Sequence, residues 1–208
     1  VVFEGNVPAD PAACVPLKEL LQDGPPRTRP PAPRAWLGEA VQIKPPPELS
    51  FRRQSGSNLL LVGQQPEEAH GVLATTAVAL AAQHGSDSAA CFHVLDGTPA
   101  DEPYGASWQQ LAEALPHSVE VSSPRKATRV IESISSELSR RDEADDESAA
   151  PIFLLICNLG RFRELRPDED DLGFGGFGDD RPTSPSQRLA TILRNGPALG
   201  IHVLVWCD

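Results

Sequence analysis

A stretch that could bind phosphate lies at residues 58–83, where an apolar run is followed by a polar segment and a run with helical spacing. Loops that hold phosphate in this setting have the pattern G-x-x-x-x-G-K-[ST]. Their backbone N–H groups and lysine contact the phosphates, and their hydroxyl binds magnesium. Here Gly63 fits the first glycine, but Glu68, Ala69 and His70 replace the second glycine, the lysine and the hydroxyl. The pattern predicts the scaffold of a phosphate site without its chemistry.

The residues expected to form this altered loop are contiguous. They are Gly63, Gln64, Gln65, Pro66, Glu67, Glu68, Ala69 and His70, with the polar loop itself expected over Gln64–His70. Gly63 is expected to allow the tight strand-to-helix turn, because a residue without Cβ tolerates unusual backbone angles. Pro66 and the two glutamates stiffen and charge the loop. We therefore expect it to serve as a packing or interface surface that meets basic groups of a neighbour.

Two further positions could contribute to chemistry, because each follows a predicted buried strand. Asp96 directly follows the apolar run 89–95. An acid there lies on the ligand-binding edge of an open α/β sheet, but Asp-Gly is also a common turn, and both interpretations stay open. Cys157 and Asn158 follow the most apolar run. In ATPases with a phosphate loop, a magnesium-ordering Asp and a water-activating Glu stand there. Neither residue supplies a carboxylate, so no catalytic residue is assigned.

Composition narrows the classes of partner. The chain has 208 residues, 40% hydrophobic content and a net charge of −11. It can bury one sizeable core, and so acidic a surface repels nucleic-acid phosphates. The acidic run 142–147 is interpreted as solvated, because metal ligands must converge in space. The four cysteines lack metal-like CxxC spacing and are expected to be structural thiols in a reducing cytoplasm: Cys14, Cys91, Cys157 and Cys207.

The elements that must position these residues alternate between strand and helix, as in a mostly parallel α/β sheet. No apolar run approaches the roughly 18 residues of a membrane span. The buried strands, expected at the centre of the sheet and apolar on both faces, are Leu59–Val62, Phe92–Leu95, Ile152–Ile156 and His202–Val205. Helices are expected after the altered loop, over 108–115, from Pro124 with Ser123 as N-cap to about Arg141, and over 186–193, with a short strand at 119–121.

Residues 1–54 are expected to form an irregular β and proline-rich arm. It begins with a β-like VVF segment and a helical turn or two at 17–21. The proline-rich segment 25–33 is interpreted as a connector, with a recognition ligand as the alternative. A strand or hairpin is expected over 35–44, with Gly38 at its turn. The basic spot at residues 51–53 could contact phosphate, although a solvated strand end is favoured. The acidic, glycine-rich segment 168–180 is expected to be an exposed loop, with partner docking as the alternative.

The order of these elements resembles the motor domain of the FtsK/SpoIIIE group of DNA-translocating ATPases. The most specific matches are Ser123-Pro-Arg-Lys-Ala127 and Arg194-Asn-Gly-Pro-Ala-Leu-Gly-Ile-His202. The resemblance covers residues 55–208 and is nearer to the tandem domains of EccC/EssC-like type VII secretion proteins. It implies a RecA-like P-loop NTPase fold in a domain expected to be truncated at its C-terminus. Where most members have a polar sensor motif, this chain has Cys207-Asp208.

The resemblance implies a function that the altered motifs qualify. With phosphate loop, magnesium strand and sensor all changed, we expect no ATP hydrolysis and no cofactor. The domain would act as an assembly, regulatory or recognition module of a larger DNA or protein translocase. Its partners would be neighbouring FtsK-like domains or subunits, in the cytoplasm or in the soluble part of a membrane-associated complex, while the whole assembly contacts DNA or secreted protein. The alternatives are an ATP–Mg-binding domain that uses the altered loop, and a DNA-contacting ring member, which the acidic charge disfavours.

Overall fold

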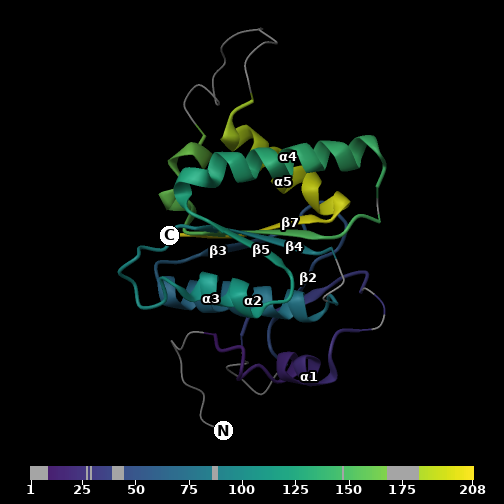
Figure 1. Ribbon diagram of the computed structural model, residues 1–208, viewed down its shortest axis with the longest axis vertical. Coiled ribbons are helices and arrows are strands. Elements are labelled where there is room, and N and C mark those ends of the chain that lie inside the picture. The colour runs from purple at the N-terminus through teal and green to yellow at the C-terminus, as the bar shows by residue number, and fades with distance from the viewer. Residues whose placement is uncertain are drawn as a thin grey trace.

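Parallel strands form the central layer of the protein, with helices on both sides (Figure 1). The computed structural model describes residues 9–26, 28, 30–38, 45–85, 89–146, 148–167 and 183–208. Within these residues the central sheet is 5-stranded and parallel, in the order β3-β7-β6-β4-β5. Its strands are β3 (Leu59–Val62), β4 (Cys91–Asp96), β5 (Ser118–Ser122), β6 (Ile152–Cys157) and β7 (Ile201–Cys207). This architecture confirms the predicted α/β fold class.

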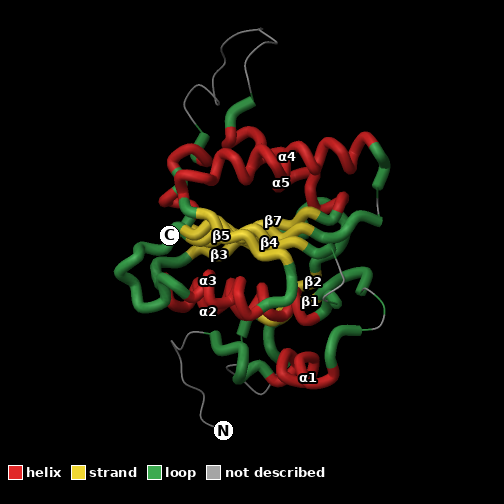
Figure 2. The backbone as a smooth tube through the Cα atoms, in the orientation of Figure 1, coloured by secondary structure: helices red, strands yellow, loops and turns green. Residues whose placement is uncertain are grey.

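The helices divide between the two faces of the sheet (Figure 2). Helices α4 and α5 cover one face, and α2 and α3 cover the other. Their bounds are α2 (Pro66–Ala82), α3 (Ser107–Ala114), α4 (Ala127–Glu143) and α5 (Pro185–Asn195). Short 3-10 turns lie at η1 (Pro124–Lys126), η2 (Leu159–Arg161), η3 (Arg163–Leu165) and η4 (Gly196–Leu199). Each predicted helix is present, although α4 starts at Ala127, after a 3-10 turn, and the Ser123 side chain makes no capping hydrogen bond.

The strand β6 divides the core into two halves. Phe153 and Leu155 pack on the side of α2 and α3, whereas Leu154 and Ile156 pack on the side of α4 and α5. Every residue of β6 is buried, as expected for a strand with helices on both faces. The predicted central positions of the second, third and fourth apolar strands, now β4, β6 and β7, are confirmed.

The expected central position of the first apolar strand is wrong. Among the described residues β3 pairs with β7 alone, so β3 is an edge strand. Leu59 packs into the α2 side of the core, but Leu60 and Val62 point to the other face and are 61% and 74% exposed. The hydrophobic cluster beneath α4 and α5 contains no residue of β3, because these helices pack over β4, β6 and β7. An apolar run indicates a strand, but not how many neighbours the strand has.

The N-terminal arm packs on the outer side of α2 (Figure 1). It contains α1 (Val15–Asp23), β1 (Arg34–Trp36) and β2 (Glu48–Ser50). Leu17 and Trp36 pack against Ala79 of α2 in a separate hydrophobic cluster. Gln83, which follows α2, accepts a 2.8 Å hydrogen bond from the backbone N–H of Arg34. Helix α2 is therefore buried on two sides, which explains why its small and apolar residues are found on more than one face of the helix.

A strand or hairpin was expected over 35–44, and the first residues of this range belong to β1, which pairs antiparallel with β2. Residues 39–44, the initial VVF segment and the segment 168–180 lie outside the described residues. Of the helices in the described part of the chain, none combines the length and apolar character needed to cross a bilayer.

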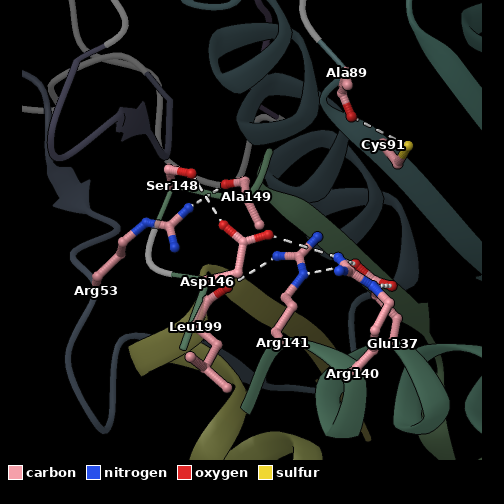
Figure 3. Close-up of polar contacts among 10 residues, drawn as sticks. All are labelled: Arg53, Ala89, Cys91, Glu137, Arg140, Arg141, Asp146, Ser148, Ala149 and Leu199. Atoms are coloured by element: carbon pink, nitrogen blue, oxygen red, sulfur yellow. Dashed lines mark hydrogen bonds and ion pairs between the residues drawn. The ribbon is translucent and has the colours of Figure 1, made fainter. Parts of the chain in front are cut away.

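Polar side chains tie together the amino ends of the strands (Figure 3). Arg53 donates a hydrogen bond to the carbonyl of Ala149, just before β6. Arg141, although buried, donates to the carbonyl of Leu199 (2.9 Å), just before β7, and to Glu137 (2.8 Å). Arg53 therefore lies at the opposite edge of the sheet from the altered loop, where it contacts the segment that leads into β6.

The segment before β3 contacts His202 and the two residues that flank the stretch Arg194–His202, Leu193 and Val203. The side chain of Asn58 donates to the carbonyl of Leu193 and accepts from the N–H of Val203, both at 2.8 Å. His202 Nδ1 lies 2.8 Å from the carbonyl oxygen of Ser57. These contacts help to hold β3 beside β7 in parallel register, and His202 is the residue of the stretch that takes part in them.

Candidate functional site

A pocket of about 520 Å³ lies at the carboxyl edge of the central sheet. The ends of β4, β6 and β7 and the start of α2 surround it. It is lined by Gln64, Pro66, Gly97, Thr98, Pro99, Glu102, Tyr104, Asn158, Arg161, Trp206 and Asp208. Open α/β sheets bind their ligands at this edge, so the pocket is the candidate functional site.

The altered loop is shorter than the sequence pattern predicts. Only Gly63–Gln65 connects β3 to α2, because α2 begins at Pro66. The N–H of Ala69 donates to the carbonyl of Gln65 (3.1 Å), so it is already used inside the helix. Proline in the first helical position and acidic residues in the first turn favour this early start. The predicted loop over Gln64–His70 is therefore wrong from Pro66 onward.

Gly63 is not required for the turn, contrary to expectation. Its φ lies outside the left-handed region, and a Cβ added to it would meet nothing within 4 Å. Its N–H donates to the carbonyl of Cys207 (3.1 Å), and its carbonyl accepts from Nε1 of Trp206 (2.9 Å). Gly63 thus extends the pairing of β3 with β7, and the hydrogen bond from Trp206 holds the start of the Gly63–Gln65 loop against β7.

His70 is held in a cluster between α2 and α3. Its Nε2 lies 2.7 Å from Oγ of Ser107, and Ser107 donates its hydrogen to the carbonyl of Tyr104 (2.6 Å), so the imidazole is the donor. The ring also packs 4.9 Å from the Tyr104 ring and 5.0 Å from that of Trp108, between centroids. Burial lowers the pKa of His70, and the nearby Asp96 carboxylate offsets this in part. His70 is a packed, neutral side chain at neutral pH.

Asp96 makes the turn that was one of its two open interpretations, and ligand binding by its carboxylate stays a prediction. It ends β4 at the carboxyl edge of the sheet, and its Oδ1 accepts the N–H of Thr98 (2.9 Å), which makes a turn. The adjacent Gly97 is required there, because an added Cβ would lie 2.5 Å from the carbonyl oxygen of Cys157.

Cys157 and Asn158 stand at the end of β6 in different environments. Burial, and then the charge of Asp96, raise the pKa of the Cys157 thiol well above its usual value, so it is a protonated core residue. Asn158 has φ 61° in the left-handed region. Its Oδ1 is buried and has no hydrogen-bond partner among the described residues.

The structure separates the predicted site residues into three groups. Gln64, Pro66 and Asn158 line the main pocket. A smaller groove of about 190 Å³ runs between β3 and α2, lined by Leu61, Val62, Gly63, Gln65, Glu68, Ala69, Val72 and Trp206. Four predicted residues line neither of these cavities: Glu67, His70, Asp96 and Cys157. Sequence reasoning missed Arg161, Tyr104 and Trp206. Only the position of Trp206 at the carboxyl end of the last apolar strand could have indicated it.

Comparison with known proteins identifies the fold. No protein-family model and no curated protein matches the chain. Among solved structures, the cytoplasmic domain of the Thermomonospora curvata type VII secretion ATPase EccC matches with a TM-score of 0.60 and 20% sequence identity. The match covers 85% of this chain and 21% of that one, so this chain spans about a fifth of the length of the structure. The predicted resemblance to an EccC-like P-loop ATPase domain is confirmed for the fold.

Proposed function

We propose that this chain is a motor-like domain of a larger ATP-driven DNA or protein translocase, in which it does not hydrolyse ATP. It acts as an assembly, regulatory or recognition module next to related domains of the FtsK and EccC kind. The observation that carries this proposal is the helical start of α2 at Pro66, where the phosphate loop of an active ATPase would be.

The residues at this edge do not fit ATP–Mg. A phosphate loop needs a run of free backbone N–H groups and a lysine. Here Pro66 has no N–H, and the N–H of Ala69 is used within the helix. Ala69 also stands at the position where the pattern has its lysine. Glu67 and Glu68 place negative charges in the first turn of α2, where a triphosphate would be repelled.

The magnesium and water-activating positions point the same way. Cys157 is a buried, protonated thiol, and Asn158 is an amide. His70, in the position of the magnesium-binding hydroxyl, donates to Ser107 and carries no negative charge. Magnesium is bound mainly by carboxylates, phosphates and water, so this set of groups gives it little to bind.

The alternative function is ATP binding through the altered loop. The main pocket, at about 520 Å³, has room for a nucleotide-sized ligand, and Arg161 offers it a positive charge. Glu102 and Asp208 line the same pocket and oppose an anion. The net charge of −11 likewise disfavours direct DNA contact by this chain, so DNA or secreted protein would be contacted by the assembly as a whole.

The proposal is tested by measuring phosphate release from ATP–Mg, with the purified chain alone and with added DNA. We expect release at the level of a buffer blank in both conditions. As a control, the variant Arg161→Ala should give the same blank rate, since any residual signal from a contaminating ATPase would be unaffected by this change. Turnover by the parent chain that disappears in Arg161→Ala would favour the alternative.

A further inference from the structure

We propose that helix α1 is a detachable cover for the outer side of α2. In this movement α1 lifts away from α2 as one unit, while the central sheet and the β1–β2 pair stay folded. The outer side of α2 thereby switches between a covered and an uncovered state. The movement is a property of this chain and does not rest on the proposed function.

Helix α1 is held by one small apolar cluster. Leu17, the buried residue of α1, belongs to a cluster that is separate from both halves of the main core. The other members of this cluster are Cys14, Trp36 and Ala79. In the described part of the chain, no side chain from Val15 to Asp23 makes a hydrogen bond or an ion pair. Burial of a single leucine contributes far less than a domain core, so this cluster can open before the rest of the protein.

The helical state of α1 adds little stability of its own. The helix has 9 residues, and isolated helices shorter than about 12 residues are marginal in water. The side chain at its N-cap, Cys14, makes no capping hydrogen bond. Its first turn contains no acidic residue and its last turn contains no basic one. The helix therefore depends on its docking to α2, and we expect both to be lost together.

The interface between α1 and α2 is incompletely packed. A groove of about 310 Å³ is lined by Leu21 of α1 and the nearby Pro25, and by Val78 and Ala82 of α2. Leu21 is 54% exposed although it lines this groove. Atoms that face a gap lose packing contacts, so the groove weakens the docking of α1.

The strand that follows α1 is anchored more firmly, which sets the limit of the moving unit. Ala35 of β1 belongs to the main core on the α2 side. The side chain of Gln83 accepts a hydrogen bond from the N–H of Arg34 (2.8 Å) and donates to the carbonyl of the same residue. Gln83 also donates to the carbonyl of Ala79 (2.7 Å), which fixes this clamp to α2. Strand β1 therefore stays on α2 when α1 moves.

Two buried thiols report on the opening of different parts of the chain: Cys14 beside α1 and Cys157 in β6. Both are labelled with excess N-ethylmaleimide in a chain that carries Cys91→Ser and Cys207→Ser, and labelling is followed by peptide mass spectrometry. We expect Cys14 to react about 100-fold faster than Cys157, because the latter is reached only when the sheet opens. Ile134→Val, in the core beneath α4, should accelerate the labelling of Cys157 severalfold and leave that of Cys14 unchanged.

Two variants of α1 complete the test. Leu17→Ala should accelerate the labelling of Cys14 about tenfold or more. Val15→Ala is the matched control, since Val15 is 61% exposed, and it should change this rate by less than about threefold.

The proposal is overturned if Ile134→Val accelerates both thiols equally, because α1 then opens only with the whole chain. It is also overturned if Cys14 reacts as slowly as Cys157, if Leu17→Ala has no effect, or if Cys14 reacts as fast as in an unfolded peptide, since α1 would then not be docked at all. The experiment contains no nucleotide, so ATP binding or hydrolysis by this chain would refute the proposed function and leave these rates unaffected.

Discussion

The guanidinium of Arg53 occupies the space where a side chain at Gly200 would lie. A Cβ added to Gly200 would stand 2.6 Å from Nη2 of Arg53, and the φ of Gly200 is +75°. Arg53 also donates to the carbonyl of Ala149, so it links the segments that lead into β6 and β7. The packing at this amino edge therefore requires a glycine at position 200. Gly63, at the carboxyl edge, has neither a positive φ nor an atom close to where its Cβ would lie.

We therefore predict opposite results for the same substitution at these two glycines. Gly200→Ala should lower the free energy of unfolding by about 2 kcal/mol or more, through strained backbone and displacement of Arg53. Gly63→Ala should change it by less than about 0.5 kcal/mol, because the site has open space and an ordinary backbone. Urea unfolding followed by circular dichroism measures both. Equal losses in the two variants would contradict the assigned roles.

His70 should make the protein less stable in acid. Burial lowers the pKa of His70 below 6.5, so in this region the unfolded chain takes up more protons than the folded one. Stability should therefore fall as the pH drops below about 6.5, and His70→Gln should reduce this loss. His93, whose pKa burial also lowers despite Glu120, contributes separately. Thermal unfolding from pH 7 to pH 5 should show the flattest profile in the double variant with His93→Gln. An unchanged profile would refute the buried, neutral state of His70.

Glu137 should stabilise the protein above its own titration range. Hydrogen bonds from Arg140, and then from Arg141, lower the pKa of Glu137 to about 2. The stabilisation is present above the unfolded pKa of about 4.5 and is lost as the pH falls toward 2. Glu137→Gln should therefore cost about 1 kcal/mol at pH 7 and much less at pH 2.5. Glu132→Gln, an exposed change on the same helix, is the control and should cost little at either pH. A constant difference between Glu137→Gln and the parent across this range would contradict the ion-pair assignment.

Restoring two of the missing groups should not restore hydrolysis. The variant Ala69→Lys with His70→Ser supplies a lysine and a hydroxyl at their expected positions in the sequence pattern. We expect no phosphate release from ATP–Mg, because Cys157 and Asn158 still lack carboxylates and α2 still begins at Pro66. Loss of the His70 contact with Ser107 should instead lower the melting temperature by a few degrees, about 1 kcal/mol. Hydrolysis in this variant would mean that the phosphate loop is the sole defect.

Most of the fold could be predicted from the sequence, because its strongest signals are local. The apolar runs at residues 92–95, 152–156 and 202–205 predicted strands, and these strands lie in the middle of the parallel sheet as expected. The edge position of β3 could not be predicted from its own apolar residues, because it depends on which other strands pair with β3 in the folded chain. The RecA-like fold was predicted from the resemblance to FtsK/SpoIIIE-type domains, and the structural match supports this prediction at the level of the fold.

The site was harder to predict than the fold. Matching Gly63 to a phosphate-loop pattern imposed a long loop, although Pro66 and the acids after it are ordinary signals for the start of a helix. Trp206 and Arg161 come from separate segments that meet only in the folded chain. The hydrogen bond from Trp206 to Gly63 joins two residues that are 143 positions apart in the sequence, so no local pattern indicates it.

The central claim, that this carboxyl edge does not hold ATP–Mg, is tested most directly by isothermal titration calorimetry. ATP–Mg is titrated into the purified parent chain, and the measurement is repeated with Arg161→Ala to locate any binding in the main pocket. We predict no saturable heat up to about 1 mM nucleotide, because the lysine and the hydroxyl of a phosphate loop are missing, Pro66 has no N–H, and Glu67 and Glu68 repel the phosphates. A one-to-one isotherm with a low-micromolar Kd that Arg161→Ala abolishes would contradict the claim.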